Sequence, residues 1–96
     1  MALSIVWSEE ALEDIESIAS YIEKDSPVYA SSVVSKFFEK AELLLLIENP
    51  KLGRVVPEFS DENLREIFVY SYRLIYELKE SEILFVAVIH GKRLIG

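Results

Sequence analysis

The sequence has no cysteine, one histidine, one tryptophan, three glycines and three prolines. Without cysteine there can be no disulfide, no thiolate metal site and no cysteine nucleophile. A single histidine argues against a histidine-based metal site, so we expect no metal and no cofactor. The lack of disulfides is typical of a reducing compartment, and we expect a cytoplasmic protein.

Long apolar runs are also missing. The longest run, Leu43–Ile47, is far shorter than the roughly 18 apolar residues that a membrane span needs. Residues 1–4 lack the basic start and the long apolar segment of a signal peptide, so we expect no membrane contact. The 96 residues, 51% of them hydrophobic, favour a single domain over residues 1–96 with one core.

Positive charge is scarce and unevenly placed in a chain with a net charge of −7. Residues 1–48 hold three lysines, no arginine and ten acidic residues, a balance of −7. Residues 49–96 hold four arginines, three lysines and seven acidic residues, a balance of zero. The acidic total argues against a protein that coats nucleic acid, and any anion-binding chemistry must lie in the second half.

The first half of the chain predicts one strand and two helices. Residues 3–7 form a short apolar run that is typical of a strand. Ser8 can cap a helix that ends near residue 25, and Ser26-Pro27 can begin a second helix that ends at Asn49-Pro50. The short link between them predicts an antiparallel helix hairpin.

The second half predicts a loop and three strands. The loop covers residues 49–63, and the strands cover about 64–69, 72–79 and 83–90. Short turns between the strands favour an antiparallel meander, in which the last strand is apolar enough to be central. The predicted fold is α+β, in the order β-α-α-β-β-β, with the helix hairpin packed on a mostly antiparallel sheet.

The turn between the first two strands of the meander fixes their register. If Tyr70-Ser71 is a two-residue turn, Arg65 lies opposite Tyr76 and Arg73 lies opposite Phe68. Arg65 and Arg73 then face opposite sides of the sheet. They can share one site only if a bulge or a different loop length intervenes.

Several polar residues of the second half could together cleave RNA. Attack by the 2′-hydroxyl requires a base, an acid and a cation beside the phosphate. Glu58 is a candidate base and His90 a candidate acid, since both side chains can exchange protons. The candidate phosphate clamps are Arg65, Arg73 and Arg93, because a guanidinium binds phosphate in a bidentate manner.

Five of the polar residues in the second half also have a structural alternative. Arg65 with Glu66, and Arg73 with Glu77, could be cross-strand charge pairs. Arg54 could hold the loop to the helices, Glu58 could be solvated, and His90 could be a hydrogen-bonded residue at a strand end.

Four short segments, in this order, resemble the RelE/ParE superfamily of type II toxins. They are Gly53-Arg54-Val55-Val56-Pro57-Glu58, Leu64-Arg65-Glu66, Tyr72-Arg73-Leu74-Ile75-Tyr76 and His90-Gly91-Lys92-Arg93. The resemblance covers nearly the whole chain. It implies a small toxin that forms a hetero-oligomer with a cognate antitoxin, which blocks it.

The resemblance implies two alternative activities. ParE-like members poison DNA gyrase, whereas RelE-like members cleave mRNA on the ribosome. The Gly-Arg, Tyr-Arg and His-Gly segments and the acidic charge favour the ParE side. In the ribonuclease alternative, Glu58, Arg65, Arg73 and His90 would be catalytic. Arg54, Lys92 and Arg93 are expected to bind the target or nucleic acid, and a non-toxic protein that binds only antitoxin is a third alternative.

An apolar surface is expected to receive the antitoxin. Residues 43–47 are apolar on all sides of a helix, so their outward side chains should meet a partner. An amphipathic helix, and an added strand at the sheet edge, would suit this region. The acidic first half favours an antitoxin with lysine or arginine on its binding segment. The expected contact residues are Trp7, Leu43, Leu44, Leu46 and Ile47.

Overall fold

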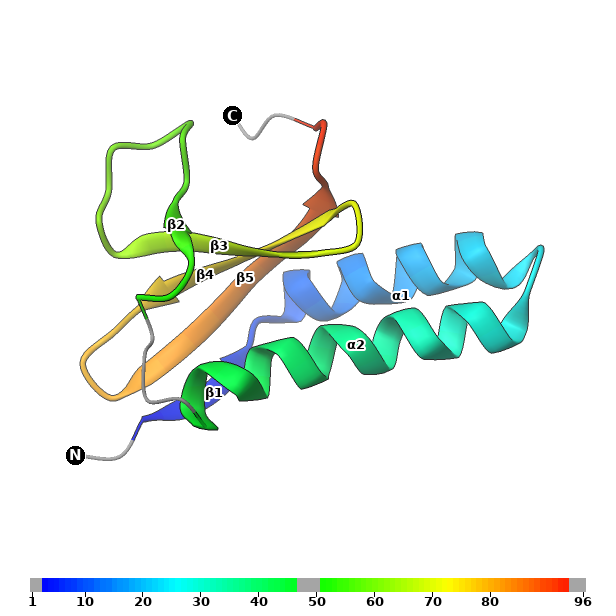
Figure 1. The fold of residues 1–96 in the computed structure, drawn as a ribbon, viewed down its shortest axis with the longest axis horizontal. Helices are drawn as coiled ribbons and strands as arrows, with labels where there is room; N and C mark the ends of the chain where they lie inside the picture. The colour runs from blue at the N-terminus through cyan, green and yellow to red at the C-terminus, as the bar shows by residue number, and fades with distance from the viewer. Residues whose placement is uncertain (1–2, 47–50, 94–96) are drawn as a thin grey trace.

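The computed structural model describes residues 3–46 and 51–93, and it confirms the predicted α+β fold. Two helices lie side by side along one face of a five-stranded sheet, whose strand order is β1-β5-β4-β3-β2 (Figure 1). The elements are β1 (Ser4–Trp7), α1 (Glu9–Glu23), α2 (Pro27–Leu46), β2 (Arg54–Val55), β3 (Leu64–Val69), β4 (Tyr72–Leu78) and β5 (Glu82–His90).

Both helices begin where the sequence predicts. The hydroxyl of Ser8 accepts a hydrogen bond from the backbone N–H of Ala11 at 3.0 Å, and that of Ser26 accepts one from Tyr29 at 3.1 Å. Each cap satisfies a backbone donor that has no partner inside the first helical turn. The predicted end of the second helix at Asn49-Pro50 lies outside the described residues.

The core lies between the helix hairpin and the sheet. Trp7 of β1 stacks on Phe85 of β5 at 4.5 Å between ring centroids and meets the edge of Phe38 of α2 at 4.8 Å. These contacts join the first strand, the last strand and the second helix. The core residues with the largest fully buried side chains are Phe37, Leu44, Leu74, Tyr76, Ile83 and Phe85.

The sheet keeps the predicted register between β3 and β4. Arg65 lies opposite Tyr76 and Arg73 lies opposite Phe68, so the register derived from the Tyr70-Ser71 turn is confirmed. The two arginines therefore face opposite sides of the sheet.

Strand β5 is central and carries a bulge. Its pairing with β4 shifts between Ile75 and Tyr76, so one extra residue of β5 is accommodated. Ile83, Phe85 and Val88 are all buried, which continues the core face across the irregularity. This explains why the apolar pattern of β5 does not alternate strictly. The strand is also parallel to β1, which joins it on its other side.

The predicted loop over residues 49–63 is wrong in one respect, because β2 forms inside it. Arg54 pairs with Glu66 and Val55 with Arg65, and the N–H of Val56 donates to the carbonyl of Leu64 at 3.0 Å. Two residues are too few for a periodic signal, so the sequence pattern does not indicate this strand.

Gly53 directly before β2 fits only because it has no side chain. A Cβ atom there would clash with the backbone oxygen of Glu66 and lie 2.7 Å from the hydroxyl of Tyr76. We expect Gly53→Ala to destabilise the fold by about 1–3 kcal/mol, measured by urea unfolding. Gly91→Ala is the matched control, because its nearest neighbour would be the carbonyl of Ser71 at 3.0 Å. An equal loss in the two variants would contradict the expectation.

Candidate functional site

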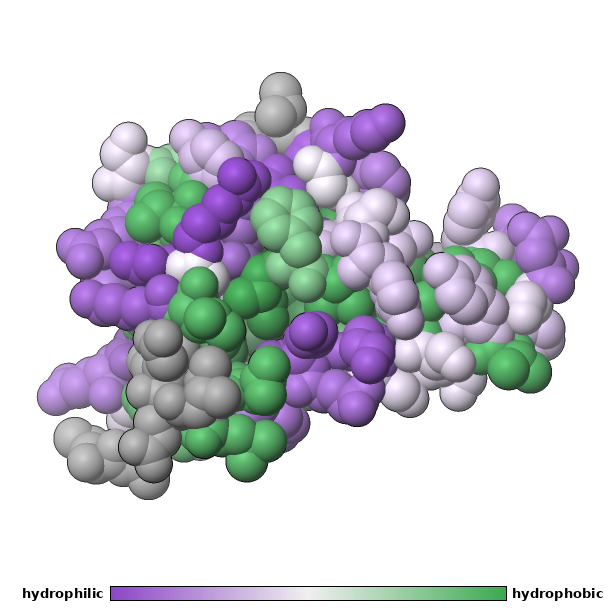
Figure 2. Space-filling view, in the orientation of Figure 1, coloured by the Kyte–Doolittle hydropathy of each residue, from purple (hydrophilic) through white to green (hydrophobic). Residues whose placement is uncertain are grey.

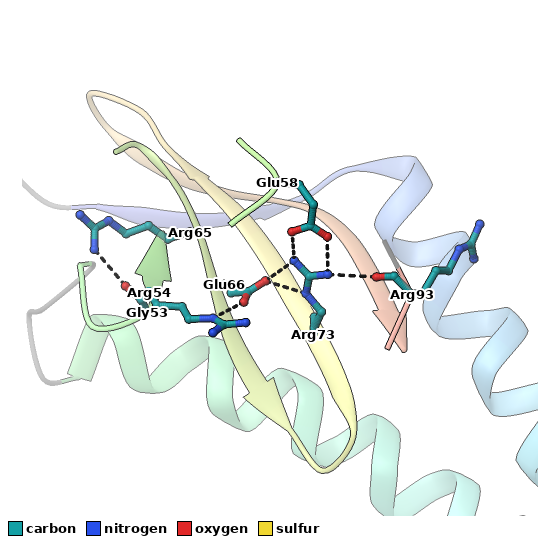
Figure 3. Close-up of polar contacts among 7 residues, drawn as sticks. All are labelled: Gly53, Arg54, Glu58, Arg65, Glu66, Arg73 and Arg93. Atoms are coloured by element: carbon teal, nitrogen blue, oxygen red, sulfur yellow. Dashed lines mark hydrogen bonds and ion pairs between the residues drawn. The ribbon is translucent and has the colours of Figure 1, made fainter. Parts of the chain in front are cut away.

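Arg73 on β4 is buried, and its guanidinium group is hydrogen-bonded on all sides. Its side chain is 3% exposed. Nη1 and Nη2 donate to the two oxygens of Glu58 at 2.8 and 2.7 Å, while Nε donates to Glu66 at 2.6 Å. Nη2 also contacts Glu66 at 2.6 Å, and Nη1 donates to the carbonyl of Arg93 at 3.0 Å (Figure 3). The five N–H groups of a guanidinium thus all have acceptors within the protein.

Glu66 connects this cluster to β2. Its side chain is fully buried on β3, and one carboxylate oxygen accepts from Nε of Arg54 at 2.5 Å (Figure 3). Arg54 itself is exposed, and its guanidinium lies 5.1 Å from the ring centroid of Phe68. The four charged groups of Arg54, Glu58, Glu66 and Arg73, here called the clasp, balance one another.

The clasp fixes the segment after β2 to the sheet. The hydrogen bonds to Glu58 are the largest cause of a raised pKa for Arg73, opposed by burial and reinforced by Glu66. The cation is thus held by two carboxylates, one from β3 and one from the segment that follows β2. The expected pairing of Arg73 with Glu77 is wrong. The two residues lie four positions apart on one strand, a separation of about 13 Å. The partners of Arg73 come instead from β3 and from the segment after β2.

Arg65 has a separate structural role at the start of β3. It donates to the carbonyls of Glu62 at 2.8 Å, Gly53 at 3.0 Å and Lys51 at 3.3 Å. The expected pairing of Arg65 with Glu66 is wrong, since neighbouring residues of a strand point to opposite faces. Arg65 therefore fixes the backbone before β2 to β3. The structure does not unite Arg65 and Arg73 in one site.

Tyr76, in the core, also binds the backbone before β2. Its hydroxyl accepts from the N–H of Gly53 at 3.1 Å, and burial raises its pKa, opposed by this hydrogen bond and by the charge of Arg65. A raised folded pKa gives stability that is present below the unfolded value of about 10 and is lost as the pH rises through the folded value. We expect the free energy of unfolding to fall above about pH 10, and less steeply in Tyr76→Phe. Parallel pH profiles of the two proteins would contradict this.

The end of β5 presents three more of the predicted residues. His90 is exposed, its ring lies 5.8 Å from that of Tyr72, and its Nδ1 accepts from the N–H of Lys92 at 3.2 Å. Lys92 and Arg93 are exposed, and the N–H of Arg93 donates to the carbonyl of His90 at 2.9 Å. The two candidate proton-transfer groups thus have different partners: both carboxylate oxygens of Glu58 accept from Arg73, while the Nδ1 of His90 accepts from Lys92.

Asp14 is a structural residue that sequence reasoning did not select. Its carboxylate accepts from the N–H of Val88 in β5 at 3.0 Å. Strand β1 ends at Trp7, opposite Phe85, so none of the described strands pairs with β5 on that side beyond this point. An acid on the α1 face that meets the sheet supplies the missing acceptor. The sequence signal is an acidic residue adjacent to the buried Ile15.

The predicted antitoxin surface is only partly exposed. Leu46 is 78% exposed, whereas Trp7 and Leu43 are half-buried. The prediction is wrong for Leu44, which is 1% exposed and belongs to the core, because its position on α2 faces the sheet. Ile47 lies outside the described residues.

Within residues 3–46 and 51–93, no group of three histidine or acidic side chains is placed to hold a metal ion. Neither described helix is long and apolar enough to span a membrane.

Several solved structures share this fold. The chromosomal ParDE system of P. aeruginosa matches with a TM-score of 0.75 and 20% identity, over 92% of this chain and 95% of that chain. The E. coli DinJ-YafQ toxin-antitoxin complex matches with a TM-score of 0.70 and 19% identity, over the whole of both chains. The YoeB dimer of Staphylococcus aureus matches with a TM-score of 0.62 and 17% identity, over 94% of this chain and 98% of that chain. The sequence has no significant match among curated proteins.

The family described as "ParE toxin of type II toxin-antitoxin system, parDE" matches residues 5–95, which is nearly the whole chain. This match and the fold together define a toxin of a type II toxin–antitoxin system, within the RelE/ParE superfamily. The chain belongs to the ParE toxin family.

Proposed function

We propose that this toxin acts on DNA gyrase and not as a ribonuclease. The observation that carries the proposal is the saturation of Arg73 by Glu58, Glu66 and the carbonyl of Arg93. A guanidinium whose donors are all engaged has none to offer a phosphate. A carboxylate held by the same arginine is likewise poorly placed to accept the proton of a 2′-hydroxyl.

The placement of the other candidates supports the same conclusion. Arg65 faces the opposite side of the sheet and binds backbone carbonyls. His90 lies at the end of β5, and its ring nitrogen Nδ1 accepts from the backbone N–H of Lys92. A general acid, a general base and a phosphate clamp must surround one scissile bond. The match to the ParE family over residues 5–95 favours the gyrase activity that the resemblance implies.

We further propose that Arg54, Lys92 and Arg93 contribute to target binding, because all three side chains are exposed in the acidic chain. The proposed antitoxin contacts are Trp7, Leu43 and Leu46. They leave apolar surface where the C-terminal part of α2 lies beside β1. Solved complexes of related toxins with antitoxins support such a partner.

The proposal is tested with purified protein in two assays run side by side. We expect inhibition of gyrase supercoiling at concentrations that leave mRNA intact in a translating ribosome extract. Induced cells should arrest growth, lose supercoiling and keep their mRNA, and the protein encoded by the neighbouring open reading frame should prevent the arrest. Ribosome-dependent mRNA cleavage would overturn the gyrase proposal. Absence of any effect in both assays would favour a protein that only binds antitoxin.

A further inference from the structure

A groove with an apolar floor lies between the C-terminal part of α2 and the β2 edge of the sheet. Leu43 of α2, Ile67 and Phe68 of β3, and Leu52 ahead of β2 line it. Leu52 is 51% exposed and Phe68 46% exposed, so two of these side chains are substantially open to solvent. Figure 2 shows hydrophobic residues gathered in this region, bordered by hydrophilic ones.

Two cations border this groove, although the chain as a whole carries −7. Lys40 is exposed and makes no ion pair among the described residues. Arg54 uses Nε for Glu66 and keeps a side chain that is 60% exposed, with its guanidinium beside Phe68. The carboxylate of Glu66 is fully buried and is shared with Arg73, so it does not neutralise Lys40.

We infer that this groove binds an apolar segment of the antitoxin that carries an acidic side chain beside its apolar residues. The apolar side chains would lie on Leu43, Leu52 and Phe68. The carboxylate would meet Lys40 and the exposed terminal nitrogens of Arg54, so the bound antitoxin would cover an arginine that is also proposed to contact the target. The inference rests on the proposed function in so far as the partner is an antitoxin.

The local charge decides the chemistry of the occupant. The acidic first half of the chain favours a basic antitoxin segment, but most of that charge lies on α1, where Glu9, Glu10, Glu13 and Glu16 are exposed. At the groove a basic segment would meet two cations, and like charges across an interface disfavour binding. An acidic segment gains charge pairing there as well as apolar burial.

Lys40→Glu tests the inference, with Lys24→Glu as the matched control. Both lysines are exposed, neither makes an ion pair among the described residues, and Lys24 lies at the opposite end of the helix hairpin (Figure 1). The probe is the protein encoded by the neighbouring open reading frame, and calorimetry gives its dissociation constant. We expect Lys40→Glu to weaken binding at least about tenfold, and Lys24→Glu to leave it within about twofold.

Two further measurements complete the test. Phe68→Ser should also weaken binding while its thermal midpoint shows that the protein remains folded. Changing the acidic residues of the antitoxin segment to lysine should restore binding to Lys40→Glu. Unchanged or tighter binding by Lys40→Glu would overturn the inference, as would equal losses in the two lysine variants.

The toxicity of the same variants separates this inference from the proposed function. Lys40→Glu should still arrest growth and inhibit supercoiling, but escape the antitoxin. If it loses the supercoiling effect while antitoxin binding is unchanged, the groove contacts the target and the inference is wrong. If the parent protein leaves gyrase unaffected, the gyrase proposal fails, while the binding constants still decide what the groove holds.

Discussion

Arg73→Met is expected to destabilise the protein by about 3–5 kcal/mol, because it leaves two carboxylates without their buried cation. Glu66 is fully buried and Glu58 is 14% exposed, so neither can regain full hydration. Domains of this size are stable by only about 5–15 kcal/mol, so the variant should be close to unfolded at 37 °C. The measurement is the free energy of unfolding in urea, with the transition followed by circular dichroism.

Two controls separate the buried charge from the mere loss of an arginine. Arg54→Gln removes the exposed partner of the same Glu66 and should cost at most about 1 kcal/mol. Arg73→Met combined with Glu66→Leu should recover part of the stability, because an apolar replacement removes the stranded charge. A small loss for Arg73→Met, equal to that of Arg54→Gln, would show that the clasp contributes little.

Leu44→Asp is expected to prevent folding, whereas Leu46→Asp should leave the stability within about 0.5 kcal/mol of the parent protein. The two leucines lie two positions apart on α2, but Leu44 is 1% exposed and Leu46 is 78% exposed. The first change places a charge in the core, and the second places it in water. Thermal unfolding and the dispersion of amide resonances distinguish the two outcomes.

Only Leu46→Asp can therefore report on antitoxin binding at the end of α2. It should weaken the complex without changing the fold, since Leu46 offers apolar surface to a partner. Loss of binding by Leu44→Asp would reflect unfolding instead. A folded Leu44→Asp protein would contradict the position of this side chain in the core.

Most of the fold can be predicted from local sequence signals, namely helix caps, apolar periodicity and turn residues. Ser8 and Ser26 mark both helix starts, and the Tyr70-Ser71 turn sets the register of β3 and β4. These features depend on residues that are neighbours in the chain. The strand β2 escapes prediction because its two residues are extended only through pairing with β3.

The candidate site was predictable in its members but not in its connections. The charges of Glu58, Arg65 and Arg73 mark them in the sequence, but charge alone does not indicate which partners lie nearby. The register separates Arg65 from Arg73, and that much follows from the turn length. The capture of Arg73 by Glu58 depends on how the segment after β2 folds back over the sheet, for which there is no periodic signal.

The parallel pairing of β1 with β5 has a consequence for the order of events during synthesis. Ser8 reaches the carbonyl of Val86, 78 positions away in the sequence, and Trp7 stacks on Phe85. Contacts of this range form late, because a long stretch of chain must first be ordered between them. A polypeptide interrupted before β5 would lack the strand that joins β1 to the rest of the sheet, and also the carbonyl of Arg93 that binds Arg73. Incomplete translation products of this toxin are therefore expected to be unfolded, and a cell would meet the active molecule only once translation has passed the last strand.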